Sequence, residues 1–446
     1  MTPPPTALPR SVRAGYGSGS VATGAFGTVP GLMLLPYLTD TLGVAALLAG
    51  AIVLLPKAWD VVLNPYAGRL SDRTVDPRGP RRPWLLRGGI GLALGFALLF
   101  AAPTMPLAAE AAWVLLVFLA TATAYAFFQV PYVAMPAELT DSYDERTRLM
   151  TWRVAILALT ILVAGGTAPA VRDAVGGRDG YRVMGLLMAG LMLVGVLSAY
   201  AGTRRAPVRT VTAGAGGLRD QLRIVGGARD FRLLLTTFVV QALATGAMLA
   251  GVDYLASDVL DRKAASTVLF LCFVGPALLL TPAWARVGER VGKRVGYSWS
   301  SVLLALGALG TATAQVAPLP VVFAFTALAG VGYAGCQMFP MAMLPDAAAV
   351  DARRTGSSRV GVYTGVWTAG ETLGLALGPG LFALVLAVGG YRSSTTGGTA
   401  QPDSALTAIT LGFGLVPAAL VVASLWWLRH YSITADTVAT SERVGP

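Results

Sequence analysis

The sequence predicts an all-α polytopic membrane protein with twelve transmembrane helices in two pseudo-symmetric six-helix bundles. The first supporting observation is composition: 55% of the 446 residues are hydrophobic and only 13% are charged, against about 25% charged in ordinary soluble domains. The second is a series of apolar stretches of about twenty residues, the length of helix that crosses the hydrocarbon layer of a membrane. The third is that the basic residues gather in alternate loops between these stretches.

The apolar stretches follow one another along the chain, and each is an expected transmembrane helix. The Pro-rich start, MTPPPTALPR, lacks a compact apolar core followed by a cleavage site, so we expect no removed signal peptide. The predicted spans are 16–38, 44–68, 84–103, 110–136, 151–172, 181–203, 231–255, 264–285, 295–316, 319–345, 358–388 and 405–429.

The distribution of basic residues predicts the orientation. Alternate loops on opposite sides of the membrane place 27 of the 34 Lys and Arg residues on one side and six on the other, with Lys57 inside a span. Loops rich in Lys and Arg stay in the cytoplasm. We therefore expect a multi-pass protein of the cell (plasma) membrane with both termini cytoplasmic. The same distribution accounts for the net charge of +11 without a nucleic-acid partner.

The longest polar stretch, rich in Arg and Gly, separates the first six spans from the last six. It is a candidate hinge between two halves. The predicted division is a cytoplasmic N-terminus at 1–15, an N-terminal six-helix bundle at 16–203, a central cytoplasmic loop at 204–230, a C-terminal six-helix bundle at 231–430 and a cytoplasmic tail at 431–446.

Short loop motifs repeat at matching positions of the two halves. The loop after the second span, GRLSDRTVDPRGPRRP, contains Asp72 and Arg73, and the loop after the eighth, ARVGERVGKR, contains Glu289 and Arg290. The loop after the fourth span, PAELTDSYDERTRLMTWR, has a counterpart after the tenth, LPDAAAVDARRTGSSR, which includes Asp346. We assign these five residues to gating or loop contacts.

Several classes of chemistry find no support in the sequence. There is no GxxxxGK[ST] phosphate loop, metal-binding cluster or nucleophile elbow. Cys272 and Cys336 both fall inside apolar spans, where a buried apolar role fits better than a disulfide or a metal site. We expect no enzymatic activity, no ATP-driven pumping by this chain and no metal.

Ionisable residues inside the spans are the first candidates for function, because a charge in hydrocarbon is costly. Lys57 and Asp60, in LLPKAWDVVLNPYAG, lie three residues apart and therefore on neighbouring parts of one helix face. Two interpretations stay open. Either the two residues neutralise each other, or Asp60 binds a proton or cation and Lys57 adjusts its pKa.

The second half contributes further candidates for substrate binding. Glu371, in GVWTAGETLGLALGPG, has no basic residue within a helical turn, so it should be protonated, face water or pair across the bundle. We count Trp367 of the same segment with it. Asp253 and Tyr254 near the outer end of the seventh span are added, although acids and aromatic residues are common at such interfaces. In the first half, Arg153 lies two residues into the fifth span and is a further candidate for substrate binding, although it could also simply anchor that span at the membrane surface.

Four segments resemble the major facilitator superfamily, and within it the glycoside-pentoside-hexuronide:cation symporters of the melibiose-carrier type. They are KAWDVVLNPYAGRLSDRT from Lys57, RRPWLL from Arg81, QVPYVAMPAELTDSYDERTRLMTWR from Gln129 and RRTGSSRVGVYTG from Arg353. The resemblance covers nearly the whole chain. It implies the major facilitator fold and a secondary transporter that works by alternating access.

The resemblance also implies residue roles. Asp60 matches the family's cation carboxylate, Lys57 its basic companion, and Tyr125 and Arg153 match positions that contact sugar. Other positions depart from the pattern, with Asn64 and Gln129 in place of two carboxylates of the cation site, Gly24 in place of the sugar-binding acid, Val133 in place of a tryptophan and Thr372 near the position of a lysine.

These departures bear on the coupling ion. Sodium needs several oxygen ligands, preferably carboxylates, whereas a proton needs one titratable group. Because only Asp60 is a carboxylate and Asn64 and Gln129 are amides, we expect a proton as the coupling ion, or uncoupled transport, rather than sodium, and no other cofactor.

The leading hypothesis is a proton-coupled importer of a sugar or glycoside, with a small-molecule substrate and the lipid bilayer as partners and a monomeric state. The missing acid at Gly24 weakens the case for a galactoside. An exporter of an amphiphilic or natural-product compound is therefore a second hypothesis. A non-transporting membrane receptor or scaffold is a third, against which the repeated halves and the intramembrane Asp60 argue.

Overall fold

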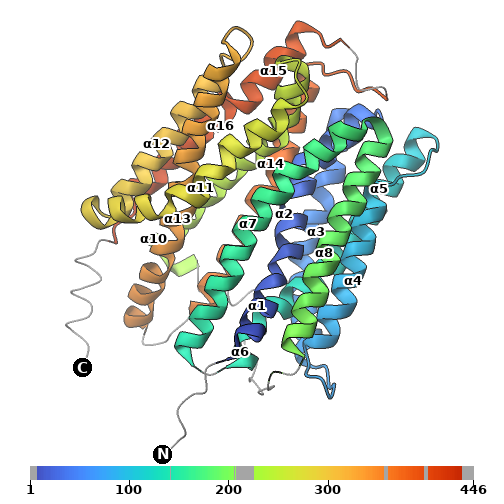
Figure 1. Ribbon diagram of the computed structural model, residues 1–446. Coiled ribbons are helices and arrows are strands. Elements are labelled where there is room, and N and C mark those ends of the chain that lie inside the picture. The colour runs from blue at the N-terminus through green and yellow to red at the C-terminus, as the bar shows by residue number, and fades with distance from the viewer. Residues whose placement is uncertain are drawn as a thin grey trace, which may run out of the picture. The chain divides into compact units, whose positions relative to one another are not determined.

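The computed structural model describes residues 8–140, 142–204, 206, 226–355, 360–395 and 400–433, and all regular structure in them is helical. Within these described ranges, ten helices are long and apolar enough to cross a membrane. Two further helices, α4 and α12, have 18 and 19 residues and begin with basic residues. The predicted fold class, an all-α polytopic membrane protein, is confirmed (Figure 1).

Contacts between residues divide the chain into two units. Unit 1 comprises Met1–Val44, Ala51–Ala215 and Ser393–Gly398, and unit 2 comprises Ala45–Gly50, Gly216–Arg392 and Thr399–Pro446. The predicted central loop, 204–230, lies largely outside the described residues.

The helices of the N-terminal half form six spans. Helices α1 and α2 with the π-helix η1 together make the first span, and the short helix α6 is a separate turn after the fourth. Their bounds are α1 Arg10–Ser18, α2 Ser20–Pro36, η1 Tyr37–Thr41, α3 Ala46–Asp72, α4 Arg82–Leu99, α5 Leu107–Ala134, α6 Pro136–Leu139, α7 Tyr143–Val175 and α8 Gly177–Thr203.

The second half repeats this arrangement. Its first span ends in a π-helix, η2, and its last span is interrupted at Gly414. The bounds are α10 Arg229–Tyr254, η2 Leu255–Val259, α11 Ala265–Val291, α12 Lys293–Thr311, α13 Leu319–Thr355, α14 Val360–Val388, α15 Asp403–Phe413 and α16 Leu415–Leu428.

Glycine contacts set the closest helix crossings in unit 1. A methyl group added to Gly15 of α1 would lie 2.6 Å from the Gly202 Cα of α8, and one added to Gly88 of α4 would lie 2.8 Å from the backbone of Phe127 in α5. Small residues allow such approaches between membrane helices, where no hydrophobic force brings helices together. The Gly-rich first span therefore packs against α8 along its backbone.

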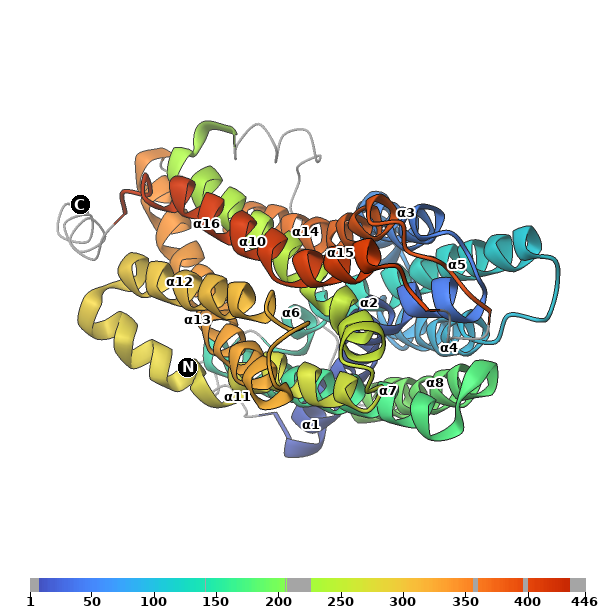
Figure 2. The same ribbon diagram turned by 90° about the horizontal axis from the view of Figure 1, so that it is seen from above.

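Unit 2 is held by a glycine crossing and by a buried polar contact. A methyl group on Gly246 of α10 would lie 2.9 Å from the Leu375 carbonyl oxygen of α14. The Gln241 amide of α10 donates to Ser301 of α12 and to Ser424 of α16, both at 2.9 Å. Figures 1 and 2 show α12 beside α13, and these two helices make extensive contact.

The two halves share a backbone feature that hydropathy does not reveal. In each, the first span ends in a π-helix closed by a bond across five residues, from the Leu42 N–H to the Tyr37 carbonyl and from the Leu260 N–H to the Leu255 carbonyl. A residue with positive φ follows each turn, Gly43 at 76° and Asp261 at 48°. The repeat is therefore structural as well as compositional.

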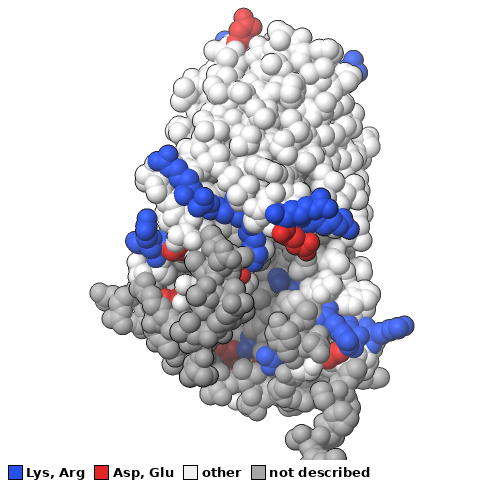
Figure 3. Space-filling view, turned by 90° about the vertical axis from the view of Figure 1, so that its left-hand side faces the viewer, with Lys and Arg blue, Asp and Glu red and all other residues white. Residues whose placement is uncertain are grey.

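Charged residues gather at the helix ends. In unit 1, α1 begins at Arg10, α3 ends after Arg69, α4 begins at Arg82 and α7 carries Arg148 in its second turn; we call this the basic end of unit 1. Figure 3 shows one face with a broad area free of charged side chains and with Lys and Arg concentrated toward one end.

Several span boundaries differ from the predicted ones. The first span begins at Arg10 rather than at residue 16, because the polar turn RSVR is helical and continues into the apolar stretch. The span is also interrupted at Gly19. The predicted spans 151–172 and 319–345 lie within the longer helices α7 and α13, which continue beyond the apolar stretch through charged residues. A hydropathy window does not count such polar turns as part of a span.

Candidate functional site

The candidate residues of unit 1 lie on α2, α3, α5 and α7. Side chains of α3 and α5 touch at two places. The Trp59 indole donates to Thr123 Oγ1 at 3.1 Å, and the Tyr66 and Phe127 rings meet edge to face with centroids 6.3 Å apart. The first of these contacts lies one residue from Asp60 on α3 and two residues from Tyr125 on α5.

Lys57 and Tyr125 meet on one aromatic ring. The Lys57 Nζ lies 4.6 Å from the centroid of the Phe26 ring, and the Tyr125 ring lies 4.4 Å from the same centroid. An ammonium over an aromatic face is attracted by the ring's quadrupole. Phe26, fully buried in α2, thus brings together a coupling candidate of α3 and a substrate candidate of α5.

Three buried oxygens near these residues lack a hydrogen-bond partner within the described residues. They are Asp60 Oδ1, Asn64 Oδ1 and Gln129 Oε1. Asp60 is 3% exposed, and no described Lys or Arg nitrogen, that of Lys57 included, lies within 4.0 Å of its carboxylate. Asp60 and Asn64 are one helical turn apart on α3, so this helix offers a carboxylate and an amide oxygen to a proton or small cation.

Arg153 lies over a tyrosine in a second polar cluster. Its guanidinium carbon is 5.7 Å from the Tyr132 ring centroid, and Nη1 lies 4.0 Å from Met150 Sδ. Its Nε is buried and has no acceptor among the described residues. The Tyr132 hydroxyl donates to the Tyr16 carbonyl at 2.8 Å and lies 2.9 Å from Ser20 Oγ, while the Tyr16 and Tyr132 rings stack at 4.9 Å.

We call Arg153, Tyr132, Tyr16 and Ser20 the arginine half-site. It joins α7, α5, α1 and α2. The Tyr16 hydroxyl is also buried without a partner in the described part of the chain. The half-site therefore presents unused hydrogen-bond donors, which suit a solute rich in oxygen atoms.

Gly24 stands where the resemblance places a sugar-binding acid, and neighbouring atoms lie close to this position. A methyl group at Gly24 would lie 3.0 Å from Thr160 Cβ and 3.3 Å from the Leu157 carbonyl oxygen. The position is filled by α7, so a carboxylate there would force α2 and α7 apart.

In unit 2, Glu371 and Trp367 lie in different surroundings. Glu371 is half-buried in α14 with no hydrogen bond or ion pair to another described residue, and it interacts electrostatically with Tyr333 of α13. Trp367 is 1% exposed and stacks on Phe238 of α10 at 4.5 Å. Trp367 thus packs between helices, whereas Glu371 is the more accessible of the two.

Asp253 and Tyr254 lie at the end of α10. The Asp253 carboxylate accepts a hydrogen bond of 2.8 Å from Ser266 of α11 and is 4% exposed. The Tyr254 ring contacts Phe382 and Tyr391 at 5.5 and 5.3 Å. Both side chains connect α10 to neighbouring segments of unit 2.

The predicted loop contacts divide into paired and exposed residues. Arg81 donates to Asp72 at 2.9 Å and forms an ion pair with Glu138. In unit 2, Lys293 Nζ lies 2.6 Å from Asp346 Oδ2. Arg73, Glu289 and Arg290 are exposed, with no ion pair to another described residue. Each unit thus has a base at the start of its third span joined to an acid beyond the apolar part of its fourth, Glu138 in α6 and Asp346 in α13.

Sequence reasoning missed Phe26, Tyr16, Tyr132, Arg81 and Lys293. Arg81 and Tyr132 lie inside the segments RRPWLL and QVPYVAMPAEL, which carried the resemblance. The sequence therefore contained a signal that could have identified both residues as candidates. Phe26 and Tyr16 had no such signal, because aromatic residues in apolar spans are ordinary packing residues.

The fold and site define a polytopic helical membrane transporter. The sequence matches the family described as MFS/sugar transport protein over residues 15–435, and the chain belongs to this family of secondary transporters.

Individual proteins resemble the chain over most of its length. It is 25% identical to the putative glycoside/cation symporter YagG of Escherichia coli, covering 98% of this chain and 95% of that protein. It is 24% identical to the glucuronide carrier protein homolog of Escherichia coli, covering 94% and 92%. A solved structure, a bacterial homolog of the human lysosomal transporter Spinster, shares the fold with a TM-score of 0.67 and 14% identity, covering 97% of each chain.

Proposed function

We propose that the chain moves a glycoside across the membrane together with a proton, and that Asp60 is the group that binds the proton. The observation that carries this proposal is the Asp60 carboxylate, 3% exposed and with one oxygen lacking a partner among the described residues. The Asp60 carboxylate interacts electrostatically with Lys57, but burying its charge is still costly, and taking up a proton removes that cost.

The choice of solute rests on the relatives and on the arginine half-site. Two relatives have names that refer to a glycoside and a glucuronide. In this chain, Arg153 and the Tyr16 hydroxyl have unused donors, and Tyr125 lies against the same ring as Lys57. Hydroxyl and ether oxygens of a sugar ring can accept from these donors.

The orientation and the assembly are part of the proposal. Lys and Arg concentrate in loops that alternate along the chain, which supports cytoplasmic termini. A working monomer without a nucleic-acid partner is part of the same proposal. Cysteine labelling of Arg10→Cys from either side of the membrane would test the orientation.

Transport by purified protein in proteoliposomes tests the coupling. We expect glycoside to accumulate inside the vesicles when the outside is more acidic than the inside, with no stimulation by sodium. Asp60→Asn should lose this accumulation but keep exchange of glycoside when the pH is equal on both sides. The matched control is Asp76→Asn, an acid in the exposed loop after α3 paired with Arg78, which should accumulate solute normally. Sodium-stimulated, pH-insensitive uptake that Asp60→Asn abolishes would contradict proton coupling.

A second variant sharpens the ion assignment. Asn64→Asp adds a carboxylate one turn from Asp60, and because sodium sites favour several anionic oxygens, this variant should gain sodium stimulation. Counterflow with a panel of sugars, glycosides and amphiphiles tests the solute, since a protein that exchanges amphiphiles and no sugar would contradict the glycoside assignment.

A further inference from the structure

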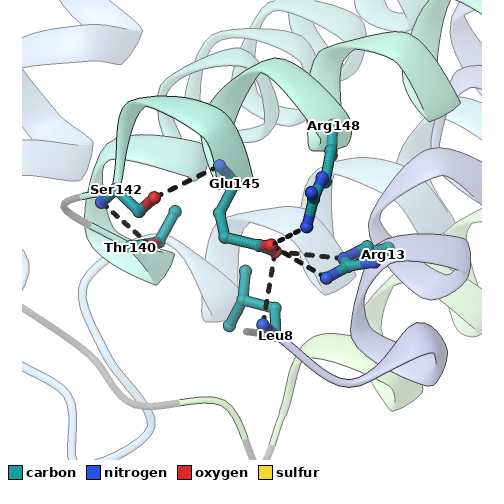
Figure 4. Close-up of polar contacts among 6 residues, drawn as sticks. All are labelled: Leu8, Arg13, Thr140, Ser142, Glu145 and Arg148. Carbon is teal, nitrogen blue, oxygen red and sulfur yellow. Dashed lines mark hydrogen bonds and ion pairs between the residues drawn. The ribbon is translucent and has the colours of Figure 1, made fainter. Parts of the chain in front are cut away.

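Glu145 connects the segment from Leu8 to Arg13 to α7. Its carboxylate accepts the Leu8 N–H at 3.2 Å and two bonds from Arg13, from Nε at 3.0 Å and Nη2 at 2.9 Å (Figure 4). Arg148 donates to the same carboxylate at 2.8 Å. The Glu145 side chain is 5% exposed and that of Arg13 16%, whereas that of Arg148 is 59% exposed. Arg13 is therefore the sheltered partner.

The start of α7 leaves this carboxylate available. Ser142 caps the helix by accepting the Glu145 N–H at 3.4 Å. In a capping box, the acid three residues later would bond back to the cap's own N–H. Here Thr140 Oγ1 accepts the Ser142 N–H instead, at 3.2 Å. Because Thr140 takes over that bond, Glu145 can turn toward Leu8 and Arg13, as Figure 4 shows.

The contact between Arg13 and Glu145 is linked through helix α1 to the arginine half-site. Arg13 is one helical turn before Tyr16, whose carbonyl accepts the Tyr132 hydroxyl and whose ring stacks on Tyr132. Arg153 lies over that same ring, two turns along α7 from Glu145. Helix α1 is thus fixed at one point to the start of α7 and at the next turn to the ring beneath Arg153.

We propose that Glu145 and Arg13 are positioning residues for solute binding: their contact, which we call the α1 latch, fixes α1 so that Tyr132 and Arg153 are aligned toward the solute. This inference rests on the proposed function for its transport readout. The latch itself lies at the basic end of unit 1 and does not contact the half-site directly. Its effect passes through the backbone of α1.

The first test compares solute affinity in three variants. Arg13→Gln and Glu145→Gln should each raise KM for the transported glycoside about fivefold, the effect of losing one aligned hydrogen bond, with Vmax nearly unchanged. Because both act through one contact, the double variant should be no worse than either single variant. Arg13→Lys keeps the charge and should recover part of the affinity.

The matched control is Arg148→Gln, which removes the exposed partner from the same carboxylate. We expect its KM to stay within about twofold of the wild type, because exposed ion pairs contribute little. An equal rise of KM in Arg148→Gln and Arg13→Gln would overturn the proposal, since it would show that surface charge and not the latch matters. So would a fall in Vmax with unchanged KM in Glu145→Gln.

A second measurement does not need the solute. Spin labels at Arg10→Cys on α1 and Trp152→Cys on α7, in a background where Cys272 and Cys336 are replaced by alanine, should give a narrow distance distribution. Glu145→Gln should broaden it and Arg148→Gln should not. An unchanged distribution in Glu145→Gln overturns the latch, whereas a wild type that exchanges no glycoside overturns the proposed function alone.

Discussion

Glu145 is a carboxylate whose protonation should govern a tertiary contact. Burial alone would raise the pKa of Glu145, but the Leu8 N–H and the Arg13 and Arg148 side chains together hold the pKa below its ordinary value of 4.5. A carboxyl group with a pKa lowered by folding stabilises the folded state above its unfolded pKa, and this contribution is lost as the pH falls through the folded pKa.

The pH dependence of thermal stability checks this assignment. At pH 6 to 7 the wild type should have a higher Tm than Glu145→Gln. The difference should begin to shrink below the ordinary glutamate pKa of 4.5 and disappear as the pH falls through the lowered pKa of the folded state. Asp76→Asn provides a comparison, because Asp76 also has a lowered pKa, of about 2, through bonds from Arg78, but lies in an exposed loop. A Tm difference for Glu145→Gln that persists unchanged below the folded pKa would contradict the role of the ionised carboxylate.

At the scale of helices, the glycines of the first span divide into those that face a neighbouring helix and those that do not. The position of Gly15 is filled by the backbone of α8, whereas a methyl group at Gly27 would meet no atom within 4 Å. Overpacking a tight contact costs about 1–3 kcal/mol, while replacing an open helical glycine by alanine favours the helix by up to about 1 kcal/mol.

The same substitution at the two sites should therefore have opposite effects. We expect Gly15→Ala to lower the Tm in detergent and Gly27→Ala to leave it unchanged or raise it, as measured by a thermal-shift assay. Equal Tm values for the two variants would show that α1 and α8 do not approach as closely as the structure indicates.

At the scale of the whole molecule, the two units share two structural features, a π-helix and an ion pair. Each has a π-helix at the end of its first span. Each also has an ion pair that joins the base at the start of its third span to an acid beyond the apolar part of its fourth, Arg81 with Glu138 and Lys293 with Asp346. Because the pairs recur in both units, we expect them to stabilise corresponding helix ends during transport.

Removing either pair should slow transport without weakening binding. Arg81→Gln and Lys293→Gln should each lower Vmax in counterflow by about fivefold, on the scale of one lost charge-assisted bond, with KM little changed. Arg78→Gln, which removes an exposed pair with Asp76, is the control and should behave like the wild type. An increase of KM alone in the two test variants would instead indicate a role in solute binding.

The sequence predicted features that depend on local composition. Apolar stretches located the spans, and the pairs formed by Arg81 and Lys293 lie in loops whose repetition was visible. Features that depend on distant contacts were not predictable. Phe26 joins Lys57 and Tyr125 only because α2, α3 and α5 meet, and Glu145 turns from a helix cap to Arg13 because Thr140 takes its place. The breaks at Gly19 and Gly414 arise inside apolar stretches, where hydropathy is uniform.

The α1 latch also has a consequence for biosynthesis. Arg13 and its partner Glu145 are 132 residues apart, and at roughly 5–20 residues per second the ribosome needs about 7 to 26 seconds to make the intervening chain. Over that interval the second, third and fourth spans are made before the first has a partner for its arginine. The first span must therefore keep its place by its own hydropathy and the charges of Arg10 and Arg13, and its final attachment is a late event in assembly.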